Sequence, residues 1–276
     1  MILDIDSLRL KKILEKVGDV KLMNILELRT KLSNYKMEKQ SFLNDTYLWV
    51  NMAIQAIDDL PGDNLVFEVP SAKNSEKPKS IKRNDREKLV NRIVNKDIYN
   101  SAYVMMISSL EDYFNKIMKL LLMYDNNRIK YHMNGINMQS EVNIIDFLNN
   151  SKEEMIEKII DQKIDNLFYA SLKKQLEYLD EALGIVICKD SWYKWIEYKA
   201  RRDVIIHNNS IINDVYISKV NDYGKFINGK EVVFDKQEFS DIVSSLKAII
   251  GEIDRLIRIE YHVPSSKEAK ELMEQD

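Results

Sequence analysis

Glycine and proline are scarce in this chain, which has only 7 Gly and 4 Pro in 276 residues. Turn-rich β architectures use both residues heavily, whereas long helices exclude them, so the scarcity favours a helical fold. Apolar residues make up 45% and charged residues 31% of the chain, which is the balance of a globular protein. The length suffices for one large domain, or for one domain with a helical extension.

Cysteine is almost absent too, and no long apolar run occurs. The single Cys188 excludes an internal disulfide and a zinc site built from cysteines. It lies in the apolar run 184–188, where we expect a buried and unreactive thiol. No run approaches the ~18 apolar residues that a membrane-spanning helix requires, and residues 1–10 lack the apolar core of a signal peptide. We therefore expect a cytoplasmic protein with no membrane association.

Histidine and glycine patterns argue against several enzyme classes. The three histidines, His132, His207 and His262, form no pair at helical i, i+4 spacing and no His-Glu-x-x-His motif. The glycines are isolated, so no Gly-rich loop is present to hold a phosphate. We expect neither a bound metal nor a cofactor.

Charge is unevenly distributed along the chain. The net charge of −3 gives no overall positive field of the kind that attracts nucleic acids. Residues 73–97, however, carry nine Lys/Arg against four Asp/Glu. Such a patch can contact phosphates, although a solvated loop and helix face is the simpler interpretation.

Apolar periodicity predicts two helical parts separated by a linker. The first is an amino-terminal helical segment over residues 1–62, interrupted at Gly18–Asp19. Prolines and basic residues mark 63–83 as a basic loop or linker. A helical domain follows over 84–262, and we expect the polar tail 263–276 to fray.

Within the second part, the apolar residues of 98–121 trace one stripe of a central helix. Further helices are predicted from the capping pair Ser151 and Glu154, from Asp190 to the helix stop at Asn208–Asn209, and from Asp235 onward. Between the last two, residues 215–234 alternate with a period near two around the turn signal Asn228–Gly229, which predicts a small β-hairpin. The predicted fold class is therefore all-α, a helical bundle with a β-hairpin insertion and an extra amino-terminal helical segment.

Three polar residues near the end of one predicted helix form the candidate site: Arg202, Asp203 and His207. Asp203 lies one turn before His207, so its carboxylate can orient the imidazole and favour the charged form. Arg202 and His207 are roughly 140° apart around an ideal helix, with a rise of about 7.5 Å. One helix does not focus both groups on one point, whereas two copies packed about a two-fold axis can.

These residue types suit RNA cleavage by transesterification. A histidine can take the proton of the 2′-OH or protonate the leaving oxygen near neutral pH. An arginine holds the phosphate through two hydrogen bonds and stabilises the charge that develops on it. This chemistry requires no metal, and DNA, which lacks the 2′-OH, is not a substrate.

The segment Arg202-Asp203-x-x-x-His207 resembles the Arg-x4–6-His signature of HEPN-domain ribonucleases. The order that follows, with two asparagines, the predicted hairpin and a long closing helix, is similar to that of larger HEPN proteins of prokaryotic defence systems. The first helix of the HEPN domain commonly carries a polar or acidic residue that faces the site, and the segment 108–113 with Glu111 occupies this place. The resemblance covers about residues 84–261 and does not extend to the first 60.

The resemblance implies a HEPN-like bundle that acts as a metal-independent endoribonuclease, a toxin or anti-phage effector that cleaves tRNA or other RNA. It implies a homodimer and a regulatory or antitoxin partner. Arg202, Asp203 and His207 are the expected catalytic residues, and the expected supporting residues are Glu111, Asn208 and Arg201. One departure is Asn209, which stands where HEPN toxins silenced by AMP transfer carry a tyrosine, so a silencing partner of that kind is not expected.

Three other interpretations remain open from the sequence. Arg201 and Arg202 can be surface charges, with His207 stabilised at a helix carboxyl end by the helix dipole. A HEPN-like module can also bind RNA, a nucleotide or a protein partner without catalysis. A third alternative is an abortive-infection protein whose toxicity is released by an unknown partner.

Trp192 and Trp195 can stack on bases, but core packing is the stronger expectation.

Overall fold

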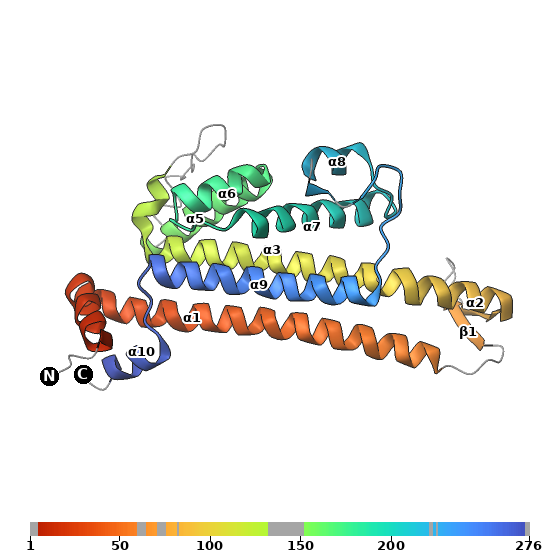
Figure 1. Cartoon of the computed structure of the whole chain (residues 1–276), viewed down its shortest axis with the longest axis horizontal. Helices are drawn as coiled ribbons and strands as arrows, with labels where there is room; N and C mark the ends of the chain where they lie inside the picture. Colours follow the sequence, from red (N-terminus) through yellow and green to blue (C-terminus); the bar gives the residue numbers. More distant parts are fainter. Residues whose placement is uncertain are drawn as a thin grey trace. The chain divides into compact units, whose positions relative to one another are not determined.

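Helices form most of the structure, a computed structural model that describes residues 5–59, 65–70, 76–81, 83–131, 152–220, 223–224 and 226–273 (Figure 1). The α-helices are α1 (Ile5–Asp58), α2 (Arg83–Arg92), α3 (Ile98–Tyr124), α5 (Lys152–Tyr169), α6 (Leu172–Glu181), α7 (Lys189–His207), α8 (Asp214–Val220), α9 (Lys236–Glu260) and α10 (Ser266–Met273). A π-helical segment, η1 (Ile93–Asp97), joins α2 to α3, and a 3-10 helix, η2 (Asn126–Lys130), follows α3. The mostly helical fold predicted from composition is confirmed.

Two compact units make up the chain, and neither is continuous in sequence. Unit 1 comprises residues 1–40, 109–196 and 247–276, and unit 2 comprises residues 41–108 and 197–246. The helices α1, α3, α7 and α9 each contribute residues to both units. The observed division is interleaved, so it does not follow the linear boundaries expected at residues 62 and 83.

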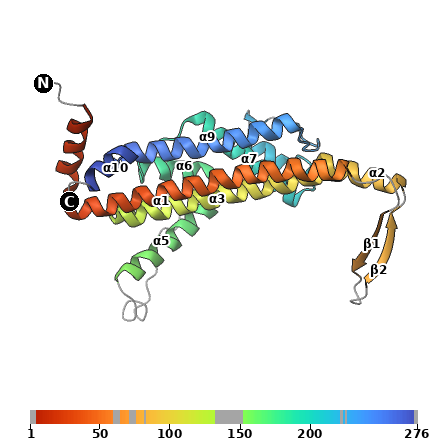
Figure 2. The same cartoon turned by 90° about the horizontal axis from the view of Figure 1, so that it is seen from below.

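In unit 1, the segments of α1, α3 and α9 lie side by side (Figures 1 and 2). The contacts of α3 in this unit are both apolar and charged. Phe114 of α3 stacks on Trp195 of α7 at 5.2 Å between ring centroids and meets Trp192 of α7 edge-on at 6.4 Å. Lys39 of α1 pairs with Asp112 of α3 at 2.8 Å. Both tryptophans are buried, so the expectation that they pack in the core is confirmed.

In unit 2, aromatic rings from segments distant in sequence meet around α9. Phe239 of α9 contacts Tyr99 of α3 at 5.1 Å and Tyr47 of α1 at 6.3 Å between centroids. The predicted stripe of α3 extends from residues of unit 2 into residues of unit 1, and most of its members are buried, as the helical period requires. These members are Ile98, Ala102, Met106, Leu110, Tyr113, Ile117 and Leu121.

The structure overturns the helix break expected at Gly18–Asp19, because α1 continues from Ile5 to Asp58. A single glycine costs a helix only about 1 kcal/mol relative to alanine. That cost does not end a helix of 54 residues, although Figure 2 shows the first turns of α1 running in a different direction from the rest.

The β-hairpin expected over 215–234 is also wrong. Residues 214–220 form α8, whose start is capped by the Asn213 side chain accepting from the Tyr216 N–H at 3.0 Å. Among the described residues of this region, strand pairing is limited to an isolated antiparallel bridge between Ile211 and Glu231. The turn predicted at Asn228–Gly229 is confirmed, since the Lys230 N–H donates to Ile227 O at 3.1 Å and Gly229 has a φ of +78°.

A β-hairpin does occur, but in the stretch expected to be a linker. The strands β1 (Leu65–Pro70) and β2 (Glu76–Ile81) pair antiparallel, with Leu65 opposite Ile81 and Pro70 opposite Glu76. The sequence of β2 contains a proline and three polar or charged residues between its ends, a composition that gives no strand signal on its own. Pairing with the more apolar β1 is what holds it extended.

The remaining local expectations have mixed outcomes. The tail expected to fray forms α10, which buries Ala269 and Leu272. Cys188, expected to be buried, is exposed at the start of α7. Ser151 of the expected capping pair lies outside the described residues. Among the helices that the structure describes, no segment has the length and apolar character needed to cross a membrane.

Candidate functional site

The carboxyl end of α7, in unit 2, carries the candidate residues and is fixed by a tight turn. Asn209 and Ser210 have φ values of +55° and +67°. This left-handed conformation reverses the chain, and Asn tolerates it better than most residues. Ser210 N–H donates back to Val204 at 3.2 Å. The helix stop predicted from the two asparagines is confirmed, and it makes His207 the last helical residue.

Asn208 stabilises this turn through a backbone and a side-chain hydrogen bond. Its backbone N–H donates to Val204 O at 2.9 Å, and its side-chain amide donates to Ile211 O. Ser210 O in turn accepts from Val232 N–H at 2.8 Å. Asn208 therefore closes the turn that follows His207.

Arg201 is fully buried, with 0% of its side chain exposed. Its guanidinium donates two hydrogen bonds of 2.8 Å to Glu197, one turn earlier, and one of 2.9 Å to Glu238 of α9. Burial opposes the charged form, but Tyr103 and the two carboxylates outweigh it and raise the pKa of Arg201 above its ordinary value. The surface position considered for Arg201 is wrong, and a supporting contact with RNA is not compatible with this placement.

Four aromatic rings enclose the same guanidinium. Their centroids lie 4.6 Å (Phe226), 5.5 Å (Phe234), 5.7 Å (Tyr103) and 5.9 Å (Tyr198) from its central carbon. Contacts of this kind are favourable because the face of an aromatic ring attracts a cation. Glu197 also accepts from the Tyr216 hydroxyl of α8 at 2.8 Å. Arg201 and Glu197 thus join α3, α7, α8 and α9 within unit 2.

Arg202, the next residue, turns to the other side of the helix and is partly accessible, with 19% of its side chain exposed. Its Nη1 lies 3.5 Å from Asp203 Oδ1. The second oxygen of Asp203 accepts from Lys219 Nζ of α8 at 2.8 Å. Asp203 is therefore bound to Arg202 and Lys219, and Lys219 was not expected from the sequence.

His207 is exposed, and its side chain forms no hydrogen bond or ion pair with any residue that the structure describes. The expected contact from Asp203 to His207 is not formed, because Lys219 engages the carboxylate from α8. A separation of one helical turn permits such a contact but does not enforce it against a nearer cation. In this arrangement Asp203 positions Arg202, and the imidazole faces the solvent.

A second contact near the site was missed by sequence reasoning. Asn100 of α3 donates from Nδ2 to Ser210 Oγ at 3.0 Å, and its Oδ1 is buried without a donor among the described residues. Nearby, Lys96 of η1 pairs with Glu231. The two residues of each pair are more than one hundred positions apart in sequence, so no local sequence pattern predicts these contacts. The basic stretch 73–97 thus contributes at least one residue next to the turn that follows His207.

The other candidates do not join this group. Glu111 is half-buried and belongs to unit 1, whereas Arg202 and His207 belong to unit 2. His132 lies outside the described residues, and His262 is exposed in a turn with φ +53° after α9. Within the described part of the chain, no group of three or more His, Cys, Asp or Glu residues is arranged to hold a metal ion.

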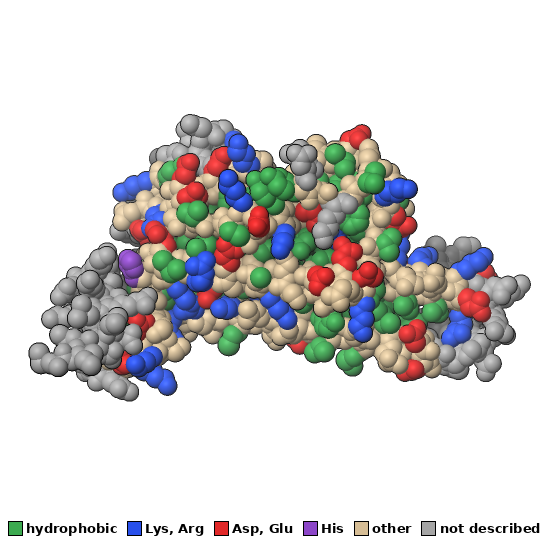
Figure 3. All heavy atoms as spheres, in the orientation of Figure 1, with side chains coloured by type: hydrophobic (Ala, Val, Ile, Leu, Met, Phe, Trp, Pro, Cys, Tyr) green, Lys and Arg blue, Asp and Glu red, His purple; other side chains and the backbone are tan. Residues whose placement is uncertain are grey.

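On the face shown in Figure 3, cationic and acidic side chains are interspersed, so this face presents no broad positive surface. In comparisons with known proteins, no family model, no curated protein and no solved structure matches this chain.

Proposed function

We propose that the chain is a metal-independent endoribonuclease of the HEPN type that acts on tRNA or other RNA in the cytoplasm, as a toxin or an anti-phage effector. The observation that carries the proposal is the placement of an accessible His207 and a partly accessible Arg202 within the last two turns of α7. The imidazole has no competing partner among the described residues, so it is available for proton transfer. Arg202 is held by Asp203, which Lys219 holds in turn.

The proposed reaction is an internal transesterification. The imidazole of one His207 removes the proton of the 2′-OH, the 2′-oxygen attacks the adjacent phosphorus, and the bond to the 5′-oxygen of the next nucleotide breaks. A protonated imidazole supplies the proton to that leaving oxygen. Arg202 stabilises the negative charge on the phosphate oxygens during the exchange. The products are a 2′,3′-cyclic phosphate and a 5′-hydroxyl.

This chemistry predicts that RNA cleavage persists in excess chelator. Histidine and arginine supply the proton transfers and the charge stabilisation, and neither task requires a divalent ion. The measurement is cleavage of total RNA and of tRNA by the purified chain with and without EDTA, with the ends of the products identified by phosphatase and kinase treatment. Strict dependence on Mg²⁺ or Mn²⁺, or products with 3′-hydroxyl ends, would contradict the mechanism.

Two His207 residues are needed for this scheme, since one acts as base and one as acid, so we propose a homodimer with both copies of α7 at the interface. Exposed apolar residues next to the motif support this: Ile206, Ile211 and Val233 are 47%, 37% and 56% exposed. Ile211 and Val233 lie on either side of the Ser210–Val232 hydrogen bond. Apolar groups gathered at a polar site are typical of surfaces that bind another protein.

We expect the active species to have the mass of two chains in solution. A heterodimer of an Arg202→Ala chain and a His207→Ala chain holds only one His207 and one Arg202, so the scheme with two imidazoles predicts that co-expression of these chains does not restore cleavage. Each variant alone serves as the control. A strictly monomeric mass for the active protein would exclude the shared site, whereas absent complementation in a proven dimer shows that all four residues are needed.

The second candidate function is a non-catalytic HEPN-like module that binds RNA, a nucleotide or a protein partner. One observation favours it: Asp203 is engaged by Lys219 and does not orient His207. An imidazole without an orienting carboxylate is a weaker general base. Retention of RNA binding without any cleavage, in a preparation whose mass shows the dimer, would select this function over the ribonuclease.

A further inference from the structure

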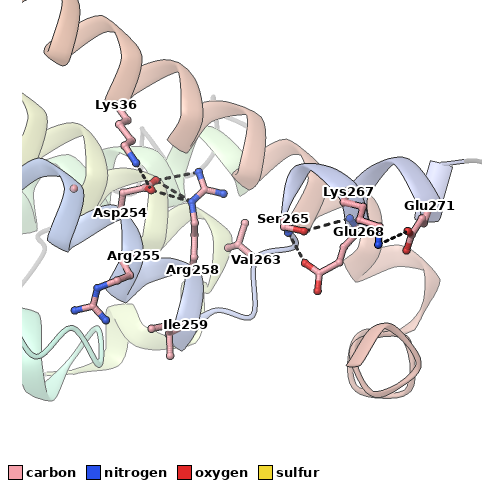
Figure 4. A pocket seen from close by; sticks show the side chains of 11 residues that line it. Lys36, Asp254, Arg255, Arg258, Ile259, Val263, Ser265, Lys267, Glu268 and Glu271 are labelled. Atoms are coloured by element: carbon pink, nitrogen blue, oxygen red, sulfur yellow. Dashed lines mark hydrogen bonds and ion pairs between the residues drawn. The ribbon is translucent and has the colours of Figure 1, made fainter. Parts of the chain in front are cut away.

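A cavity of about 430 Å³ lies in unit 1 beside the last turns of α9, and several of its polar groups bind one another (Figure 4). Asp254 accepts from Lys36 Nζ at 2.9 Å and from Arg258 Nε at 3.0 and 3.1 Å. Glu268 Oε2 accepts from the Ser265 N–H at 2.6 Å. Backbone groups that the fold leaves open to a partner lie in unit 2, along the hairpin of β1 and β2.

This hairpin is a sheet of two strands in the part of the chain that the structure describes, so each strand has one free edge (Figure 2). A free edge presents a row of unpaired N–H and C=O groups to which another strand can bind. An isolated two-stranded hairpin is also marginally stable in water, and a third strand or a packed helix stabilises it. The hairpin is thus suited to strand addition wherever one of its edges is open.

Two prolines reveal which backbone groups of the hairpin face outward. Pro78 stands opposite Glu68, and Pro70 stands opposite Glu76. Neither proline has an N–H to donate, so these two pairs are non-hydrogen-bonded pairs of the antiparallel ladder. Such pairs alternate with hydrogen-bonded ones, and their N–H and C=O groups point away from the other strand. The N–H and C=O groups of Val66 and Glu68 therefore point away from β2.

The two edges differ in their capacity to bind another strand. On the outer edge of β2, Pro78 interrupts the row of donors, and Lys77 and Lys79 flank it in sequence. Proline and lysine are residues that block edge pairing in natural sheets. The outer edge of β1 keeps its donors at Val66 and Glu68, and this strand contains no lysine. Strand addition is therefore expected at β1.

We propose that the edge of β1 pairs antiparallel with β1 of a second copy of this chain. The strand is complementary to itself when Phe67 lies on the two-fold axis. Leu65 of one chain then stands opposite Val69 of the other. Val66 stands opposite Glu68, and each donates to and accepts from the other across the chains. Positions 65, 67 and 69 share one face of the strand, so this face is apolar across the join.

Charge and donor positions select this register over the adjacent one. Placing Glu68 on the axis would set it opposite Glu68 of the second copy, and like charges directly opposite one another destabilise a sheet. The same shift would pair Val66 with Pro70, which cannot donate. The register centred on Phe67 avoids both faults. The contact uses no residue of α7, so it does not depend on the proposed ribonuclease activity.

Cross-linking tests the pairing, with Cys188→Ser as the common background. Across a non-hydrogen-bonded pair the Cα atoms are about 4.5 Å apart, within the range of a disulfide. Phe67→Cys should therefore form an interchain disulfide on oxidation in air with copper–phenanthroline. Lys79→Cys, the register partner on β2, is the matched control, because the two copies of β2 lie about 14 Å apart in the joined sheet. Leu65→Cys and Val69→Cys chains should cross-link faster when mixed than when alone.

Proline variants test the edge itself. Val66→Pro should slow the disulfide of Phe67→Cys at least about tenfold, because it removes an interchain donor from both copies and no donor to β2. Ser80→Pro makes the same change at the register partner, on the outer edge of β2, and should leave the rate unchanged. An intrachain disulfide between Leu65→Cys and Ile81→Cys, which are paired in the hairpin, verifies the fold of each proline variant.

The proposal is overturned if Phe67→Cys cross-links no faster than Lys79→Cys, a comparison that requires no proline variant. Equal slowing by Val66→Pro and Ser80→Pro, with the hairpin intact, would also overturn it. Cross-linking of Phe67→Cys to a different protein in a cell extract, with no disulfide between copies, would assign the edge to another partner.

Discussion

Replacing His207 with alanine is expected to reduce RNA cleavage by roughly 100-fold or more, the contribution typical of a general acid or base. Because His207 is exposed at the end of α7 and its side chain forms no hydrogen bond or ion pair with the described residues, the substitution should leave the fold intact. Arg202→Ala should also abolish cleavage, since the phosphate would lose its charge-stabilising group. The measurement is the initial rate of RNA cleavage by equal amounts of purified protein, alongside toxicity on expression in cells.

Lys219→Ala is an informative companion variant. Lys219 contacts Asp203 and not the proposed phosphate position, so its loss should reduce the rate by less than the loss of Arg202. Lys236→Ala, an exposed cation at the start of α9, serves as the control for a general change of surface charge. Full activity of both His207→Ala and Arg202→Ala would refute the assignment of the site. Unfolding of both would show that the two residues are structural.

The largest effect on stability is expected at Arg201. Arg201→Met removes the cation but retains an apolar side chain, and it leaves Glu197 buried beside the Tyr216 hydroxyl with no positive partner. Loss of one member of a buried ion pair typically costs about 3–5 kcal/mol, because the remaining charge stays buried. We expect a loss of this size in the free energy of unfolding, measured by urea denaturation with circular dichroism.

Arg202→Met is the matched control for this experiment, because it makes the same chemical change one residue later at a partly exposed position. An ion pair at a partly exposed position contributes about 1 kcal/mol or less, so the control should lose much less stability than Arg201→Met. Arg201→Lys should fall between the two, since lysine keeps the charge but cannot bind Glu197 and Glu238 with a planar fork. Equal stability of Arg201→Met and Arg202→Met would contradict the buried network.

The sequence alone determined the features that depend on neighbouring residues. The apolar stripe of α3 repeats every three or four residues, so its buried face follows from helix geometry before any partner is known. The end of α7 is encoded in the same way, because two asparagines tolerate the left-handed turn that stops the helix. The position of His207 at a helix end was therefore predictable.

Only the tertiary structure decided which neighbour of the motif is buried and which charges meet. Arg201 and Arg202 are adjacent and chemically identical, yet the 100° step between successive helical residues turns one toward Tyr103 and Phe226 and the other outward. Which side is the interior depends on α3 and α9, far away in sequence. Lys219 reaches Asp203 for the same reason, and residues 214–220 become helical where Tyr216 meets the buried Glu197. Local patterns fix the helix and its end, whereas the choice of inward face and of ion partners is made by the packing of segments that the sequence does not place side by side.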